Sequence, residues 1–260
     1  MSLSRLLGPV GLSLLLGLAH GGAWAQKEPP PYVPSVGQEG KDVVWVPTSQ
    51  PLVERMLDMA KATPADYVMD LGSGDGRLVI AAAKRGIRAL GVEYDGNMVA
   101  LSRRNAAQAG VSERAEFVEA DLFKTDFTRA TVITMFLLPD LNLKLRPQIL
   151  ALKPGTRVVS NTFDMGEWEA DATSIVGAES GCLDYCTARL WIVPANVAGT
   201  HKTARGELKL EQTFQMLRGS FRIGEKLVPV RGKVLGNDVI LNAGGEELRG
   251  TVDGKQLSLH

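Results

Sequence analysis

The sequence predicts an α/β protein: a mostly parallel β-sheet covered by helices on both faces, followed by a small C-terminal antiparallel β module. Short apolar runs alternate with helical patterns between about residues 48 and 195, as expected for a parallel sheet. One of these runs leads through the glycine-rich loop 72–76 directly into an alanine-rich helix. From Gly206 onward the helical period is absent, and apolar residues alternate with polar ones.

The α/β part begins with a helix that Thr48 or Ser49 can cap and that Pro64 ends. Beyond it, most of the short apolar runs are followed by a segment with apolar residues every three or four positions. We therefore expect, in chain order, strand 67–71, helix 77–85, strand 89–93, helix 97–109, strands 115–119 and 131–136, helix 141–150 and strand 157–162. A pair of strands near 174–176 and 189–193 can complete the sheet, which makes the predicted α/β fold Rossmann-like.

The C-terminal β module is predicted over residues 205–260. Its first strand alternates apolar with polar residues, as a half-buried strand does, at Leu208, Leu210, Phe214 and Met216. The dipeptides Asn237-Asp238 and Asp253-Gly254 favour hairpin turns. Glycines recur at turn-like intervals, and we interpret all of them as turns: Gly219, Gly224, Gly232, Gly236, Gly244, Gly250 and Gly254.

The N-terminus has the pattern of a cleaved export signal. Arg5 is a short basic region, residues 6–18 are mostly apolar, and Ala23-Trp24-Ala25 fits the cleavage rule. We expect a signal peptide over 1–25, a Pro-rich tether over 26–47, a catalytic domain over 48–195 and a periplasmic or secreted location. A disordered apolar leader and an uncleaved anchor remain the alternatives, although the apolar run is short for a membrane span.

Composition excludes several classes of function. The 29 basic residues balance the 29 acidic ones, so the chain has no general attraction to nucleic acid. Three histidines and two cysteines are too few for a convincing zinc or histidine-based catalytic set, so we expect no metal. Cys182 and Cys186 either pair in an oxidising compartment or remain two packed thiols, and their spacing does not decide between these.

The glycine loop predicts a nucleoside pocket. Glycines allow close approach of a ligand to the backbone, and the N–H groups at the start of the next helix favour an anionic ligand group. Glu93 ends the next strand, about 21 residues after Gly72, where a carboxylate accepts hydrogen bonds from ribose hydroxyls. Gly76 comes too soon after Gly74 for the usual dinucleotide fingerprint, which disfavours a nicotinamide cofactor.

Four motifs in order, VMDLGSGDGR, GVEYD, EFVEADLF and LKPGTRVV, resemble the class I S-adenosylmethionine-dependent methyltransferases over about residues 50–193. The segment DLGSGDGRLVIAAAKRG is particularly similar to protein-lysine methyltransferases of the archaeal broad-specificity type and their mitochondrial relatives. The segment LLPDLNLKLRP resembles exported bacterial methyltransferase-like proteins.

The resemblance implies S-adenosylmethionine as cofactor and assigns it a set of residues. The methionine end would lie at Asp70, Gly72, Ser73, Gly74 and Gly76, the ribose at Glu93, the adenine at Asp121 and Leu122, and the sulfonium methyl beside Leu138, Pro139 and Asp140.

Plainer interpretations exist for the same residues. Asp70 could bind loop N–H groups, Glu93 could be a solvated strand end, and Asp121 could cap a short turn. Asp140, the candidate catalytic residue, could instead cap the helix beginning at Leu141; Tyr94 is a second candidate to assist an amine acceptor.

We therefore expect a methyltransferase with an unidentified protein or small-molecule acceptor, protein lysine being the acceptor that the resemblance implies. The alternative is an exported binding protein that keeps the fold without catalysis. Neither nucleic acid nor a stable membrane span is expected, and the oligomeric state is left open.

Overall fold

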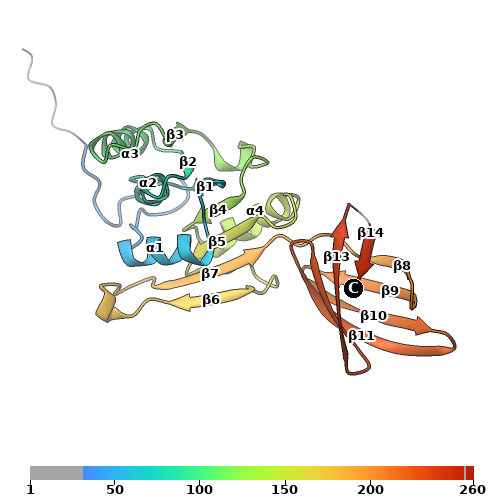
Figure 1. The fold of residues 1–260 in the computed structure, drawn as a ribbon. Coiled ribbons are helices and arrows are strands. Elements are labelled where there is room, and N and C mark those ends of the chain that lie inside the picture. The colour runs from blue at the N-terminus through green and yellow to red at the C-terminus, as the bar shows by residue number, and fades with distance from the viewer. Residues whose placement is uncertain (1–31, 255) are drawn as a thin grey trace, which may run out of the picture. The chain divides into compact units, whose positions relative to one another are not determined.

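We describe the fold from a computed structural model, in which residues 32–254 and 256–260 are described. The predicted export signal and its cleavage site at Ala25 lie outside the described residues, as does the first part of the expected tether. Figure 1 shows two β-sheets that differ in kind: the first is layered with helices, and the second consists of strands alone. This confirms the predicted fold class.

The first sheet has seven strands. They are β1 (Tyr67–Leu71), β2 (Arg88–Glu93), β3 (Ala115–Glu119), β4 (Val132–Met135), β5 (Arg157–Asn161), β6 (Ala172–Ile175) and β7 (Thr187–Ile192). Their order in space is β3-β2-β1-β4-β5-β7-β6, with β1 to β5 parallel and β7 antiparallel to both β5 and β6. The strand pair expected to complete the sheet is therefore confirmed.

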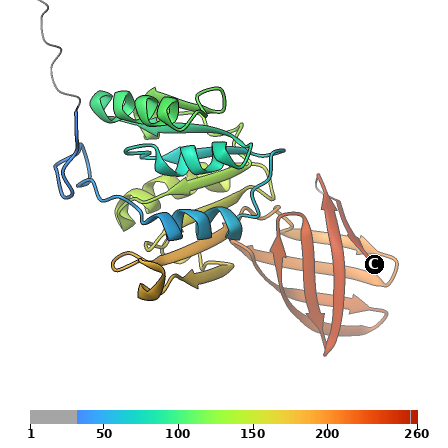
Figure 2. The same ribbon diagram turned by 60° about the vertical axis from the view of Figure 1, so that its left-hand side comes forward.

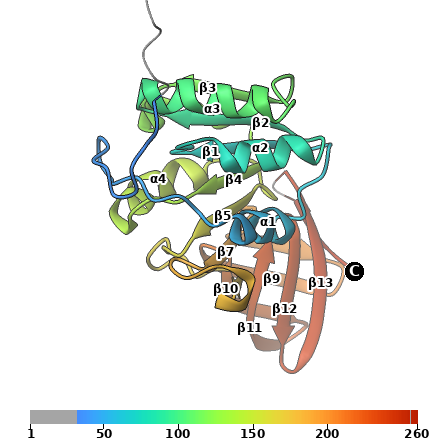
Figure 3. The same cartoon turned by 90° about the vertical axis from the view of Figure 1, so that its left-hand side faces the viewer.

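Helices cover both faces of this sheet. The α-helices are α1 (Gln50–Met59), α2 (Arg77–Lys84), α3 (Gly96–Gln108) and α4 (Pro139–Leu150), and the short 3₁₀ helices are η1 (Leu122–Lys124) and η2 (Ala178–Ser180). Figure 3 shows α1, α2 and α3 side by side on one face and α4 on the other. Within residues 32–254 and 256–260, no helix is both long and apolar enough to cross a membrane.

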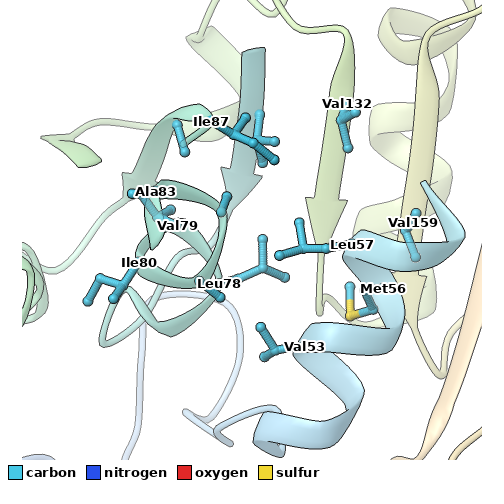
Figure 4. Close-up of a cluster of buried hydrophobic side chains, with 14 of the residues drawn as sticks. Val53, Met56, Leu57, Leu78, Val79, Ile80, Ala83, Ile87, Val132 and Val159 are labelled. Carbon is cyan, nitrogen blue, oxygen red and sulfur yellow. The ribbon is translucent and has the colours of Figure 1, made fainter. Parts of the chain in front are cut away.

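The apolar residues of the strands alternate between two cores, because successive side chains point to opposite faces. Val68, Val132 and Val159 belong to the core under α1 to α3, whereas Met69 and Ile133 belong to the core under α4. Figure 4 shows the first core, in which these side chains of α1, α2 and the sheet meet: Val53, Met56, Leu57, Leu78, Val79, Val132 and Val159. Burial on both faces explains why the strands read as near-continuous apolar runs.

The second sheet has seven antiparallel strands, and each pairs with the next along the chain. They are β8 (Gly199–Thr203), β9 (Gly206–Thr213), β10 (Met216–Ile223), β11 (Lys226–Leu235), β12 (Asp238–Ala243), β13 (Glu246–Asp253) and β14 (Gln256–Leu259). The sheet begins at Gly199, several residues before the expected start at 205. Figure 2 shows its strong curvature around one face, which encloses a core that includes Leu208, Phe221, Val234 and Leu241.

Three of the seven glycines interpreted as turns lie inside strands of this curved sheet, so the interpretation is wrong for these three. Gly219 lies within β10, Gly232 within β11 and Gly250 within β13. A Cβ at Gly219 would lie 1.9 Å from the carbonyl oxygen of Lys209, so only glycine allows this approach of neighbouring strands. Strand glycines of this kind mark bends in curved sheets. The other four glycines have positive φ and do lie at turns.

Candidate active site

A cavity of about 540 Å³ opens at the carboxyl ends of β1, β2 and β4. The strand order reverses here, because β2 and β3 lie on one side of β1 and β4, β5 and β7 lie on the other. Ligands of open α/β sheets bind at such a switch point, in pockets of roughly 300–1,000 Å³. Of the residues singled out from the sequence, the lining contains Asp70, Gly72, Ser73, Gly74, Glu93, Tyr94, Leu122 and Leu138, and it lacks Gly76, Asp121, Pro139 and Asp140.

The glycine loop needs glycine for two separate reasons. Gly72, Gly74 and Gly76 have φ values of +77°, +54° and +81°, a region that favours glycine. A Cβ at Gly74 would also lie 2.7 Å from Nε1 of Trp45 at the cavity wall, while one at Gly76 would lie 2.7 Å from the ring of Phe117 in the core. Gly74 therefore keeps the cavity open, and Gly76 serves packing.

The loop N–H groups are largely used within the chain. Gly72 and Ser73 donate to the carbonyl oxygen of Val92, and Gly76 donates to that of Ser73. Gly74 donates to Oε2 of Glu93 at 2.9 Å. These four N–H groups are therefore not free for an anionic ligand group; the expectation from the sequence concerned the N–H groups of the first turn of α2, which follow them.

Glu93 braces the loop as well as ending β2. Its Oε1 accepts hydrogen bonds from the N–H groups of Tyr94 at 2.8 Å and Asp95 at 3.0 Å, in addition to the bond from Gly74 at Oε2. A carboxylate offers about four acceptor positions. The residue is therefore no free strand end, because its acceptors hold the loop against β2.

Asp70 is a buried carboxyl at the floor of the cavity, with 7% of its surface exposed. It lies directly opposite Thr134 of β4, whose hydroxyl donates to Oδ1 at 2.7 Å. Burial raises the pKa of Asp70 to about 7; the Thr134 hydrogen bond opposes this rise, and the charges of Glu93 and Asp75 add to it. The loop-binding role weighed for Asp70 belongs to Glu93 instead.

Ser73 lines the cavity without presenting its hydroxyl to it. Its Oγ is buried and makes no hydrogen bond to any described residue. A Cβ at Gly91 would lie 2.6 Å from that oxygen, so the side chain fills the space that Gly91 leaves on β2.

Asp121 stands beside the cavity, and Leu122 lines it. Asp121 Oδ1 accepts the N–H of Phe123 at 3.0 Å, which confirms the interpretation as a cap of a short turn. Oδ2 accepts a hydrogen bond from Lys41 at 3.2 Å. The Phe123 N–H, followed by the hydrogen bond and charge of Lys41, lowers the pKa of Asp121.

Leu138 lines the cavity and Asp140 does not. Helix α4 begins at Pro139, two residues earlier than expected, so Leu138 is its N-cap and Asp140 lies in the first turn. The carboxylate of Asp140 is exposed and does not cap the helix. The alternative interpretation of Asp140 as the cap is therefore wrong.

The N-terminal segment forms one wall of the cavity, which the sequence did not reveal. Residues 38–48 line it, although 26–47 was expected to be a tether. The segment folds back on itself, since Gly37 donates to the carbonyl oxygen of Trp45 and Trp45 donates to that of Gln38. Lys41 crosses to Asp121 and lies 4.2 Å from the ring centroid of Tyr94. The apolar run VVWV at 43–46 is the signal that could have indicated this wall.

The two cysteines form a disulfide, which resolves the alternatives left open by their spacing. The Cα atoms of Cys182 and Cys186 are 5.8 Å apart, and the bond closes a five-residue loop. Tyr185 lies within that loop and reaches the cavity, together with Phe136 and Phe163. None of these three aromatic residues was identified from the sequence.

Comparison with known proteins gives consistent matches over this part of the chain. Residues 70–172 match the family described as the ANTKMT methyltransferase domain. A protein-lysine N-methyltransferase of Saccharolobus islandicus is 39% identical over 163 residues, covering 62% of this chain and 96% of that protein. The adenine nucleotide translocase lysine N-methyltransferase of Mus musculus is 34% identical over 159 residues, covering 60% of this chain and 65% of that protein.

A solved structure agrees with these relatives. An RNA methyltransferase from Salinibacter ruber, in complex with S-adenosyl-L-homocysteine, is 45% identical with a TM-score of 0.54, covering 58% of this chain and 96% of that one. The predicted cofactor, S-adenosylmethionine, is confirmed at the level of the family. The chain belongs to the class I S-adenosylmethionine-dependent methyltransferases, the family that its sequence motifs indicated.

Proposed function

We propose that this chain methylates the side-chain amine of protein lysine, with S-adenosylmethionine held in the 540 Å³ cavity. The observation that carries the proposal is the cavity itself, which joins a carboxylate-bearing half on β1 and β2 to an edge formed by the exposed Leu138. The lysine acceptor is supported by the two relatives from Saccharolobus islandicus and Mus musculus, which are both lysine methyltransferases, whereas the solved structure from Salinibacter ruber is described as an RNA methyltransferase. The lining residues proposed to hold the cofactor are Asp70, Gly72, Ser73, Gly74, Glu93, Leu122 and Leu138. Asp121 is proposed to assist from beside the cavity, and Gly76 to act indirectly, by letting the loop pack against Phe117.

The cavity residues fit this cofactor. Asp70 offers a carboxylate to the ammonium group of the methionine end, and Gly74 leaves room where a Cβ would reach Trp45. Glu93 keeps about one acceptor position for a ribose hydroxyl beyond its three backbone donors. Leu122 offers an apolar contact to the adenine ring, with Asp121 beside it.

When bound, S-adenosylmethionine would supply a methyl group on a positively charged sulfur: the amine lone pair would bond to the methyl carbon as the carbon–sulfur bond breaks in line, S-adenosylhomocysteine would leave, and the amine would lose one proton. The chain's own contribution is to orient and to exclude water, and orientation alone can account for about 7–11 kcal/mol. Asp140 lies beside the Leu138 edge of the cavity and is the candidate to receive that proton, whereas Tyr94, which lines the cavity, is the candidate to accept a hydrogen bond from the amine.

Cofactor affinity should depend on pH through Asp70. At pH 7 this carboxyl is about half protonated, and a cationic ligand favours its charged form. Binding of S-adenosylmethionine should therefore release a proton and become about ten-fold tighter from pH 6 to pH 8. Calorimetry in two buffers of different ionisation heat measures the release, which Asp70→Asn should abolish. An affinity that is flat across this range would contradict the role of Asp70.

Methyl transfer tests the acceptor directly. The purified chain is incubated with S-adenosylmethionine carrying a labelled methyl group, and with cell-envelope protein or total RNA in parallel. We expect label on lysine, located by mass spectrometry of the digested protein. Label on RNA alone would refute the lysine acceptor, and cofactor binding without any transfer would favour the non-catalytic binding protein.

We also propose that the chain is exported, because its leader fits a cleaved signal and its two cysteines are paired. N-terminal sequencing of the native protein should find Gln26 first. A Met1 or Ser2 terminus in the cytoplasmic fraction would contradict this proposal.

A further inference from the structure

Three aromatic side chains from separate segments meet at the cavity. Phe136 follows β4, Phe163 follows β5, and Tyr185 lies in the disulfide loop before β7; all three line the cavity. The ring centroids of Phe136 and Tyr185 are 5.2 Å apart, those of Phe136 and Phe163 are 6.0 Å apart, and those of Phe163 and Tyr185 are 6.1 Å apart. We call this cluster the aromatic wall.

The aromatic wall occupies the half of the cavity that the proposed cofactor contacts leave free. Asp70 and Glu93 belong to β1 and β2, and Leu122 follows β3, on one side of the switch point. The aromatic wall follows β4 and β5 and precedes β7, on the other side. Leu138 lies two residues after Phe136, so the wall begins next to the edge where the methyl group is proposed to lie. This placement assigns the aromatic half to the acceptor.

The charges around the cavity suit a cationic acceptor. Lys41 and Arg77 are the lysine and arginine among the lining residues, and both are already paired with carboxylates, of Asp121 and Asp75 respectively. No unpaired cation of the described lining therefore repels an ammonium group. The faces of Phe and Tyr rings attract ammonium ions within about 6 Å of the ring centroid, and most strongly when the ions are desolvated.

We propose that the aromatic wall of Phe136, Phe163 and Tyr185 recognises the acceptor as a cation, binding the lysine side chain and its methylated ammonium product through cation–π contacts. The inference rests on the proposed function, since it concerns the acceptor side of the same cavity. The proposal commits the site to an aliphatic amine as acceptor. A neutral nucleobase would gain stacking on these rings but no charge-dependent attraction from them.

The disulfide positions the exposed member of the wall. Tyr185 has a φ of +54°, a conformation that non-glycine residues rarely adopt without support from their surroundings. Cys182 is buried and Cys186 continues into β7, so the bond ties the Tyr185 loop to the sheet at both ends. Reduction should therefore release the Tyr185 ring from the wall without touching the residues proposed for the cofactor.

The test measures binding rather than turnover. The full chain is saturated with S-adenosylhomocysteine and then titrated, by NMR, with Nα-acetyl-Nε-trimethyllysine amide. A parallel titration uses the neutral analogue in which carbon replaces the ammonium nitrogen. We expect the cation to bind at least about five-fold more tightly than its neutral analogue, as cation–π recognition requires.

Variants then locate the site. Tyr185→Ala should weaken binding of the cation at least about five-fold, whereas Tyr185→Phe should keep it within about two-fold, because the ring face is retained. Leu183→Ala is the matched control: Leu183 lies in the same disulfide loop, is 82% exposed and is absent from the cavity lining. Phe163→Leu keeps an apolar side chain of similar size but removes the ring, so it should also weaken binding of the cation. Reduction of the disulfide should act as Tyr185→Ala does.

Several results would overturn the proposal. The first is equal affinity for the cation and its neutral analogue, and the second is an unchanged affinity for the cation in Tyr185→Ala. The third is that adenosine binds to the protein saturated with S-adenosylhomocysteine, and that Tyr185→Ala abolishes this adenosine binding. An unchanged affinity after reduction would remove the positioning role of the disulfide. Affinity for S-adenosylhomocysteine is measured in every variant and should not change; if the wild-type chain does not bind it, the proposed function fails, which is a separate outcome.

Discussion

Replacing Asp70 by asparagine is expected to change the free energy of unfolding of the ligand-free protein in a pH-dependent way. The change should be more stabilising at pH 8 than at pH 4, by about 4 kcal/mol. Burial raises the folded-state pKa of Asp70 from 3.8 to about 7, a shift of about three units worth about 1.36 kcal/mol each. The folded state therefore prefers the neutral carboxyl, so stability is lost as pH rises from about 4 through 7. Asparagine keeps an acceptor for Thr134 and removes the titration. Urea unfolding of both proteins at pH 4 to 8 measures the difference.

Asp66, directly before the strand that carries Asp70, provides a control of opposite sign. Partial burial acts to raise the pKa of Asp66. Hydrogen bonds from the Thr63 N–H, Arg157 and Thr131 outweigh burial and together hold this pKa below its usual value. Its contribution to stability is thus present above the ordinary carboxyl range and is lost as pH falls. Asp66→Asn should destabilise the protein at neutral pH. If Asp70→Asn showed the same sign as Asp66→Asn, the buried site described for Asp70 would be wrong.

Replacing Gly74 by valine is expected to weaken binding of S-adenosylhomocysteine at least about a hundred-fold, or about 2.7 kcal/mol. The new Cβ would lie 2.7 Å from Nε1 of Trp45, and the residue would be held at a φ of +54°. The loop must then move, which breaks the hydrogen bond from Gly74 to Glu93. Calorimetric titration measures the affinity.

Gly110→Val is the control variant for the effect of backbone strain alone. Gly110 has a φ of +69° after α3, and a Cβ there would meet no atom within 4 Å. Both variants should lose thermal stability because valine is strained at positive φ, but only Gly74→Val should lose the ligand. Equal ligand affinity in the two variants would show that Gly74 is not at the binding site.

The layout of the site was predictable because it follows from local pattern. Alternating apolar runs indicate the strands, and the carboxyl ends of parallel strands share one edge, so Asp70 and Glu93 were expected near one another. The motifs between residues 67 and 162 lie on elements whose type was predicted correctly, with ends that differ by a few residues.

The contacts that close the site could not be predicted, because they join residues far apart in the chain. Lys41 reaches Asp121 across 80 positions, and the aromatic wall joins residues from 136 to 185. Glu93 was expected to face a ligand, yet most of its acceptor positions bind backbone N–H groups of its own chain. In the β module, the glycines within β10 and β11 allow close strand approach, which in sequence is indistinguishable from a turn.

The central claim is that S-adenosylmethionine binds in the cavity at the switch point between β1 and β4, on the residues of the glycine loop and β2. A crystal structure of the full chain with S-adenosylhomocysteine tests it most directly. We expect the ligand between Gly74 and Leu122, with a ribose hydroxyl on Glu93, its ammonium group on Asp70 and its sulfur facing Leu138 and the aromatic wall. A ligand bound elsewhere, or one whose ribose lies away from Glu93, would contradict the account.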